Sequence, residues 1–163
     1  MYQAAQVCKI TDIKPKRLAQ LQERGTIKAT VEASGQGTRR EYDEGGVAAI
    51  LLTERLAKGG FSHREASKIA FDKRVTDLLT EQILTFMRWG NGDVIKAFIN
   101  RDRVVLLIAV RKFGGEIDIR FVDDSEKLAA EFTTLVKAEL SHVVNLTEIA
   151  LEVAERLTPK ILR

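Results

Sequence analysis

Several residue types are scarce in this chain of 163 residues, and each scarcity excludes a class of protein. The one cysteine, Cys8, cannot form a disulfide within the chain or a cysteine-rich zinc site. With only two prolines, Pro15 and Pro159, most of the chain is free to adopt regular structure. No apolar run approaches the roughly 18–20 residues that a membrane helix needs, and residues 1–14 lack the pattern of a secretory signal. We therefore expect a cytoplasmic protein that has no membrane partner.

Side chains that hold metals or catalyse reactions are also sparse. The two histidines, His63 and His142, lie far apart, and neither has a Cys, His or Glu partner four residues away. Asp123 and Asp124 precede an expected helix, where the helix dipole favours carboxylates for structural reasons. Because no nucleophile–base pair can be named, we expect neither an enzyme nor a bound metal or cofactor.

The composition is that of a folded protein whose charge is unevenly distributed. Hydrophobic residues make up 45% of the chain and charged residues 30%, which excludes a disordered chain and allows one domain or two small ones. Residues 1–74 contain 14 Lys and Arg against 9 Asp and Glu, whereas residues 75–163 contain 12 against 14. This asymmetry indicates that only the N-terminal part contacts a polyanion.

The first 42 residues contain two helix patterns separated by a tight turn. A short helix is predicted over residues 3–9, and a second runs from Pro15, which suits a first helical turn, to Gly25 as its C-cap. Asp12 lies in the turn and is one of the few residue types besides glycine that tolerate left-handed backbone geometry. We interpret residues 26–42 as a short β-excursion around a glycine-rich loop.

Capping residues predict the helices that follow. Asp43 is expected to cap a helix that ends at a Gly-Gly pair, and Ser62 forms a capping box with the Glu three residues later. The helix that begins after Ser62 is expected to continue beyond residue 70. Thr80 is interpreted as the start of another short helix that ends near Trp89.

The C-terminal part has a mixed pattern. Residues 104–110 form an apolar, β-branched run typical of a buried strand, and residues 117–121 alternate as in a half-buried strand after a hairpin connection at 113–116. Further elements are expected at residues 94–99 (a strand or one helical turn), from Ser125 (a helix), at 143–144 (a short strand) and from Asn145 or Thr147 (a last helix).

The order of the N-terminal elements is that of a winged helix-turn-helix, in which the second helix enters the major groove of DNA. Polar and cationic side chains stand early in the expected second helix, and two arginines follow the glycine-rich stretch, where a wing brings cations near phosphates. Tyr42 either contacts DNA or packs the wing onto the body. The candidate DNA-binding residues are Lys14, Lys16, Arg17, Gln20, Arg39, Arg40 and Tyr42.

Several short stretches, in this order and spacing, resemble the DNA-binding domain of MerR-type transcriptional regulators over residues 3–73. They are QVCKI (6–10), KPKRL (14–18), RGTI (24–27), GTRREYD (37–43) and KGGFS (58–62), together with Val47. The resemblance implies a homodimer that reads a two-fold-related site in double-stranded DNA, with a C-terminal part that senses a signal.

The predicted fold class is therefore α+β. It comprises a winged helix-turn-helix in residues 1–74, a helical linker in 75–92, and a small α+β dimerisation or sensing domain in 93–163. The predicted function is that of a sequence-specific, dimeric transcriptional regulator with an effector of unknown identity. The alternative is a protein-interaction adaptor that uses the winged-helix scaffold without DNA, because many MerR-type proteins carry aromatic residues where this chain has Gln20 and Leu21. Two faces are candidates for the dimer contact: Leu128/Phe132/Leu135 and Ile149/Val153/Leu157.

Overall fold

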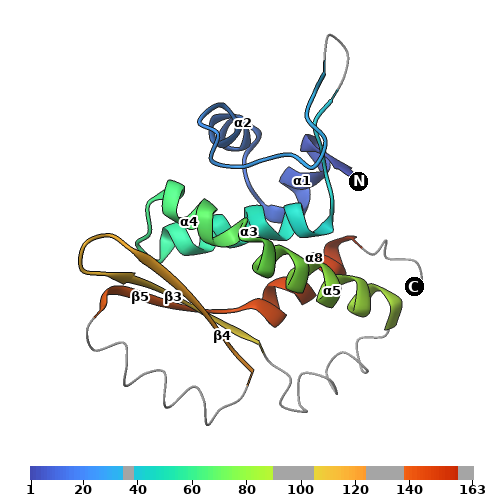
Figure 1. The fold of residues 1–163 in the computed structure, drawn as a ribbon. Helices are drawn as coiled ribbons and strands as arrows, with labels where there is room; N and C mark the ends of the chain where they lie inside the picture. The colour runs from blue at the N-terminus through green and yellow to red at the C-terminus, as the bar shows by residue number, and fades with distance from the viewer. Residues whose placement is uncertain (35–38, 90–104, 124–137, 158–163) are drawn as a thin grey trace.

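The chain folds as a mixed α+β structure, which confirms the predicted class (Figure 1). The computed structural model describes residues 1–34, 39–89, 105–123 and 138–157. The elements in chain order are β1 (Tyr2–Gln3), α1 (Ala4–Thr11), α2 (Pro15–Glu23), β2 (Glu41–Tyr42), α3 (Glu44–Lys58), α4 (His63–Ala70), α5 (Lys73–Trp89), β3 (Leu106–Lys112), β4 (Ile117–Val122), β5 (Ala138–Asn145) and α8 (Leu146–Leu157).

Helices α1 and α2 and the turn between them form where local sequence signals predict them. Asp12 ends α1 in the left-handed region, with φ 57°, and among the described residues it is the one non-glycine with positive φ. Pro15 is the first residue of α2, and Gly25, with φ +61°, follows that helix's C-cap.

The segment after α2 returns to β1 as a short antiparallel excursion. β1 pairs with β2 through Tyr2 and Tyr42, and Val31 forms an isolated bridge with Glu41. We call residues 30–42 the β-loop; its residues 35–38 lie outside the described part of the chain. The described flanks agree with the predicted β-excursion.

Helices α3 and α4 begin at the predicted caps, but α5 corrects the sequence prediction. The Asp43 carboxylate accepts a hydrogen bond from the Gly46 amide at 2.7 Å, and Ser62 forms its capping box with Glu65. No helix starts at Thr80, because α5 runs unbroken from Lys73 to Trp89. The Thr80 hydroxyl donates to the Thr76 carbonyl at 2.8 Å, so this residue is satisfied inside the helix and does not interrupt it.

The C-terminal sheet has the strand order β4-β3-β5 and is antiparallel throughout. β3 and β4 form the predicted hairpin, whereas β5 is longer than the two residues expected. α8 follows β5 directly, and the Asn145 side chain accepts a hydrogen bond from the Glu148 amide at 3.0 Å, so Asn145 and not Thr147 caps this helix. The elements predicted at residues 94–99 and from Ser125 lie outside the described residues.

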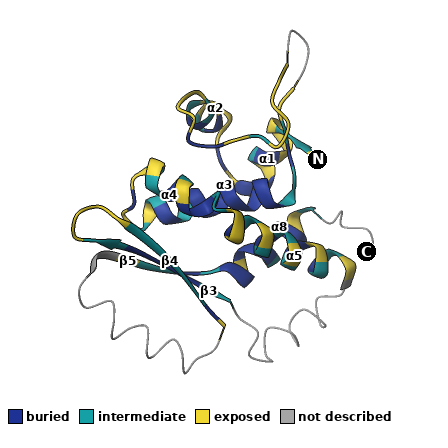
Figure 2. Cartoon of the chain, in the orientation of Figure 1, coloured by how far each residue is buried: buried dark blue, intermediate teal, exposed yellow. Residues whose placement is uncertain are grey.

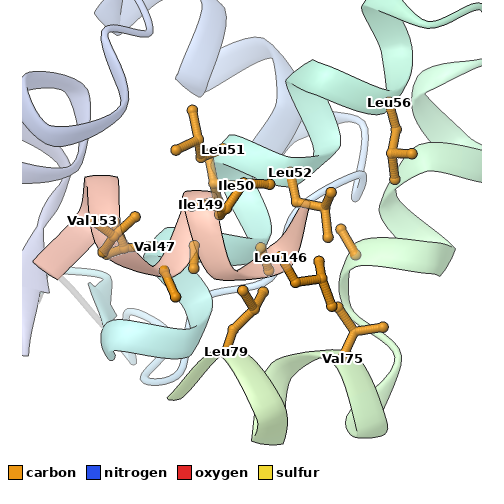
Figure 3. Packing of buried hydrophobic residues seen from close by; sticks show 14 of the residues in the cluster. Val47, Ile50, Leu51, Leu52, Leu56, Val75, Leu79, Leu146, Ile149 and Val153 are labelled. Atoms are coloured by element: carbon orange, nitrogen blue, oxygen red, sulfur yellow. The ribbon is translucent and has the colours of Figure 1, made fainter. Parts of the chain in front are cut away.

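One hydrophobic cluster joins the N-terminal helices to α5, α8 and the sheet (Figure 3). α3 lies at its centre and is buried over most of its length (Figure 2). Val47 and Leu52 of α3, Leu79 of α5, and Ile149 and Val153 of α8 are each fully buried. The predicted domain boundaries at residues 74 and 93 stay a prediction. The segment predicted as a helical linker between them lies largely in α5, which packs on both α3 and α8.

This packing corrects one expectation about assembly. Ile149 and Val153 are 0% exposed within the chain, so the face that they form is not available to a second copy. The reason is that α3 and α5 already cover this side of α8. The other candidate face, Leu128/Phe132/Leu135, lies outside the described residues.

Within the described ranges, none of the helices combines the length and apolar character that crossing a membrane requires.

Candidate nucleic-acid interface

The first cations of α2 are held at the surface. Lys14 is the N-cap of α2, and its backbone carbonyl accepts hydrogen bonds from the amides of Arg17 and Leu18 at 2.8 and 3.0 Å. The side chains of Lys14 and Lys16 are exposed, and Gln20, one turn on, is partly exposed. The N-terminus of α2 therefore presents two cations beside the positive end of its helix dipole, an arrangement that suits an anion.

Arg17 faces the body of the protein. Its Nη2 atom lies 3.3 Å from Oε1 of Glu54 on α3, and it also contacts Nε2 of His63 on α4. The sequence pattern groups Arg17 with the exposed cations of α2. Its partners Glu54 and His63 are distant along the chain, so the sequence gives no sign of these contacts. In the fold, Arg17 fixes α2 to α3 and α4.

The β-loop places Arg39 and Arg40 at the surface beside α2. Arg39 Nη1 donates to the Gln3 side chain at 3.1 Å, and Arg40 Nε lies 2.8 Å from Glu32 Oε2. Both arginines are exposed. The hydrogen bond from Arg40, followed by that from the Ala29 amide, lowers the pKa of Glu32. Exposed pairs of this kind are weak, so a phosphate group can compete for either guanidinium.

Tyr42 packs inside the protein, which corrects the expectation of a DNA contact. Its side chain is 0% exposed, and its hydroxyl accepts a hydrogen bond from Gln22 of α2. Burial is the main cause of the raised pKa of this phenol. A wholly buried ring offers no surface to a ligand, so of the two alternatives the packing role holds.

A basic groove that the sequence did not predict lies between the end of α2 and α4. It is lined by Arg24, Gly25, Thr26, Lys28, His63, Arg64, Ser67, Lys68 and Phe71. Its described lining contains no carboxylate, and the Ser67 hydroxyl donates to the Thr26 carbonyl across it. Arg64 and Lys68 are four residues apart on α4. This spacing is the sequence signal that their side chains lie on the same face of the helix.

α2 thus has cations of two other segments of the chain next to it. Gln22 connects it to the β-loop through Tyr42 and through Arg40, whose Nη1 atom donates to Gln22 Oε1 at 3.4 Å. Arg17 connects it to His63 at the edge of the basic groove. The structure therefore brings Lys14, Lys16, Arg39 and Arg40 to the surface around one helix and adds the groove cations to them.

The described residues offer no candidate metal site. They contain no group of three or more His, Cys, Asp or Glu side chains placed to hold a metal ion. Cys8 is partly buried, and this burial raises the pKa of its thiol, which disfavours the reactive thiolate at neutral pH.

Comparison of the sequence with protein-family models and with curated proteins finds no match. The resemblance of residues 3–73 to MerR-type regulators therefore stays a prediction.

Proposed function

We propose that this protein is a sequence-specific, DNA-binding transcriptional regulator of the MerR type, in which α2 enters the major groove and the β-loop acts as the wing. The observation that carries the proposal is the relationship between α1 and α2. The two helices are joined by residues 12–14, with a left-handed residue at position 12, and short turns of this kind join the helices of helix-turn-helix proteins.

The charge around α2 supports duplex DNA as the ligand. Duplex DNA presents phosphates along both edges of the major groove, and α2 has cations of two other segments next to it. Arg40 of the β-loop contacts Gln22 of α2, and Arg64 and Lys68 line the groove that begins at Arg24, directly after α2. Lys14 and Lys16 lie at the N-terminus of α2, the end from which recognition helices contact base edges.

We further propose that the protein acts as a homodimer on a two-fold-related site. A single helix-turn-helix makes few base contacts, and a second linked copy converts the next contact into an intramolecular one. The dimer surface lies away from the Ile149/Val153 face, which is internal.

The alternative function is that of a protein-interaction adaptor. Arg17, Arg39 and Arg40 already have partners within the chain, in Glu54, Gln3 and Glu32 respectively. An adaptor of this fold uses the same surface for an acidic protein and needs no DNA.

Selection of sites from random duplex DNA by the full chain, followed by salt titration, tests the proposal. We expect an inverted repeat to be recovered and log K to fall linearly with log salt, with a slope of about −0.9 for each neutralised phosphate. The double variant Lys14→Glu/Lys16→Glu should lose binding, whereas Arg88→Glu, at the end of α5 on the other side of α3 from α2 (Figure 1), should keep it. Absence of binding at low salt, or a flat salt response, favours the adaptor.

A further inference from the structure

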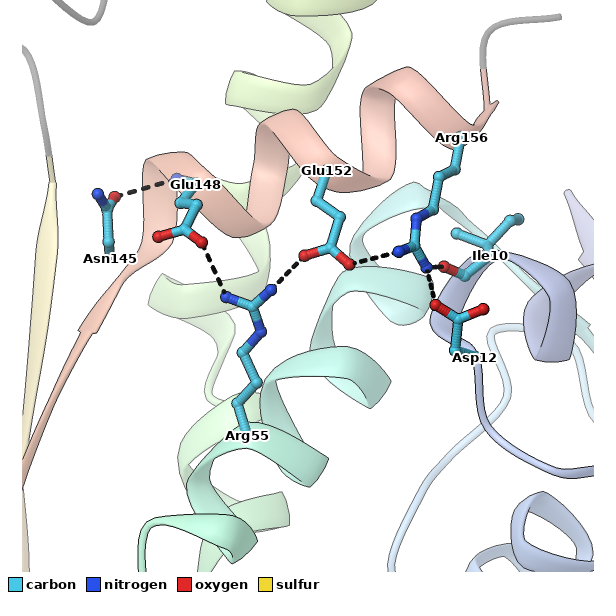
Figure 4. Close-up of polar contacts among 7 residues, drawn as sticks. All are labelled: Ile10, Asp12, Arg55, Asn145, Glu148, Glu152 and Arg156. Carbon is cyan, nitrogen blue, oxygen red and sulfur yellow. Dashed lines mark hydrogen bonds and ion pairs between the residues drawn. The ribbon is translucent and has the colours of Figure 1, made fainter.

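A row of alternating acidic and basic side chains connects α8 to the turn between α1 and α2 (Figure 4). We call it the α8 ladder; its members are Asp12, Arg156, Glu152, Arg55 and Glu148. The ladder joins three parts of the chain: the turn, the C-terminal half of α3, and α8. It adjoins the predicted DNA-binding surface, because Lys14 and Arg17 line one pocket together with its members Asp12, Arg55 and Glu152, but none of its members is a predicted DNA-binding residue.

Arg156 makes the contacts at the end of the ladder next to the turn. Its Nη1 atom lies 2.7 Å from Oδ2 of Asp12 and also donates to the backbone carbonyl of Ile10, while Nη2 lies 2.9 Å from Oε1 of Glu152. The Ile10 carbonyl is one of the last four of α1, which have no partner within that helix. A guanidinium at this position satisfies the carbonyl and interacts favourably with the negative end of the helix dipole.

Ile10 and Asp12, two of the residues that Arg156 contacts, belong to the segment that sets the direction of α2. Asp12 is left-handed, Ile13 is buried, and Lys14 is the N-cap from which α2 begins. Because Asp12 has 75% of its side chain exposed, burial does little to fix this residue. The contact from α8 therefore supplies an external constraint on the turn.

α8 is itself firmly attached to the rest of the molecule. It starts immediately after β5, and its opposite face, with Ile149 and Val153, is fully buried in the core. A displacement of β5 therefore moves α8, and a displacement of α8 moves the guanidinium that holds the turn.

We propose that Arg156 is a positioning residue for the α1–α2 turn, and that α8 thereby couples the C-terminal sheet to the orientation of α2. The inference rests on the proposed function, because its consequence for ligand binding concerns the surface of α2. Loss of Arg156 leaves every cation of that surface in place and releases the turn that orients them.

Arg55 provides a matched control for this proposal. Like Arg156, it is an arginine that pairs with Glu152, and its replacement by alanine removes the same charge. Its other partner is Glu148, 3.5 Å away on α8, and not the turn. Arg55→Ala therefore reproduces the loss of charge and of a contact to α8 without touching Ile10 or Asp12.

The test uses the full chain without DNA and then with its selected duplex. In Arg156→Ala, we expect the backbone order parameters of residues 12–14, measured by 15N relaxation, to fall from about 0.85 towards about 0.6. The Kd for DNA should rise about fivefold, which corresponds to one helix-end charge interaction. Arg55→Ala should leave both quantities unchanged, and Arg156→Lys, which keeps the cation but loses the planar fork, should fall between Arg156→Ala and the unmodified chain.

The outcomes separate this inference from the proposed function. Unchanged order parameters in Arg156→Ala overturn the inference, and so does an equal fall in Arg55→Ala, which marks a general loosening of α8. If the unmodified chain binds no DNA, the proposed function fails, while the relaxation data still decide whether Arg156 orders the turn. If Arg156→Ala does not fold, the comparison of Arg156→Lys with Arg55→Ala decides in the same way.

Discussion

Asp12 and Arg156 are 144 positions apart in the sequence, yet Oδ2 of the first lies 2.7 Å from Nη1 of the second. The aspartate belongs to the turn that precedes α2, and the arginine lies in the last turn of α8. The two ends of the described chain are thus joined at the base of the candidate recognition helix. A change in the C-terminal part can therefore reach the proposed DNA-binding surface through Arg156, which also contacts the Ile10 carbonyl.

Replacement of Asp12 should show how much the left-handed turn contributes to stability. Asp12→Ala places a side chain that disfavours φ near 57°, and we expect the free energy of unfolding to fall by roughly 1–2 kcal/mol. Asp12→Asn should cost less, because asparagine tolerates this conformation. Urea denaturation of both variants measures the difference. Equal stability of the two variants would mean that the backbone geometry at this position is not the limiting factor.

The local elements were predictable from the sequence because their causes are local. Asp12, Pro15, Asp43 and Ser62 each act on backbone groups within three or four residues, so their roles follow from the neighbouring sequence. The mistaken helix start at Thr80 has the opposite cause. Threonine is a common N-cap residue, but the apolar spacing of α5 continues on both sides of Thr80. Burial of Leu79 and Ile83 in the core therefore keeps the helix continuous.

The candidate site was predictable only in part, because burial and ion pairing depend on contacts between distant segments. Tyr42 follows two exposed arginines in sequence, yet it is enclosed by α2 and its neighbours. Arg17 has the spacing of an outward cation, but Glu54 and His63 of other helices attract it inward. The basic groove requires two segments about 40 residues apart to meet, and no local pattern encodes that meeting.

Substitution of two leucines of α5 should show whether this helix is part of the core or only a linker. Leu79 is fully buried, whereas Leu84 is 39% exposed on the same helix. We expect Leu79→Ala to lower the free energy of unfolding by about 2–5 kcal/mol, because it leaves a cavity between α5 and its neighbours. Leu84→Ala should stay within about 0.5 kcal/mol of the unmodified protein. Chemical denaturation checks both values, and similar small effects at the two positions would indicate that α5 is not part of the core.

The capping box of α4 should make stability depend on pH. Hydrogen bonds from Ser62 lower the pKa of Glu65, and Arg111, whose Nη2 atom lies 2.7 Å from Oε2, lowers it further. Because this pKa is lower in the folded protein than in the unfolded chain, the stabilisation is present above the unfolded value of about 4.3 and disappears as the pH falls through the folded value.

Glu65→Gln tests this dependence, because glutamine retains the capping geometry but carries no charge. We expect the variant to be less stable than the unmodified protein at pH 7 and equal to it at acidic pH, below the folded pKa. Thermal unfolding of both proteins from pH 7 down to pH 3 measures the convergence. A constant difference over this range would show that the ionised carboxylate is not the stabilising form.

Gly59 should be intolerant of a side chain because the end of α3 approaches β5 closely. Its φ is −78°, so the backbone itself accepts alanine. A Cβ atom at this position would, however, lie 2.7 Å from both Cε1 and Nδ1 of His142, which is too short for a carbon contact. We expect Gly59→Ala to lower the free energy of unfolding by about 1–3 kcal/mol through overpacking. His142→Ala should relieve the clash, so the double variant should be more stable than Gly59→Ala alone, and a double-mutant cycle in urea measures this coupling. Strict additivity of the two substitutions would show that His142 is not what excludes a side chain at position 59.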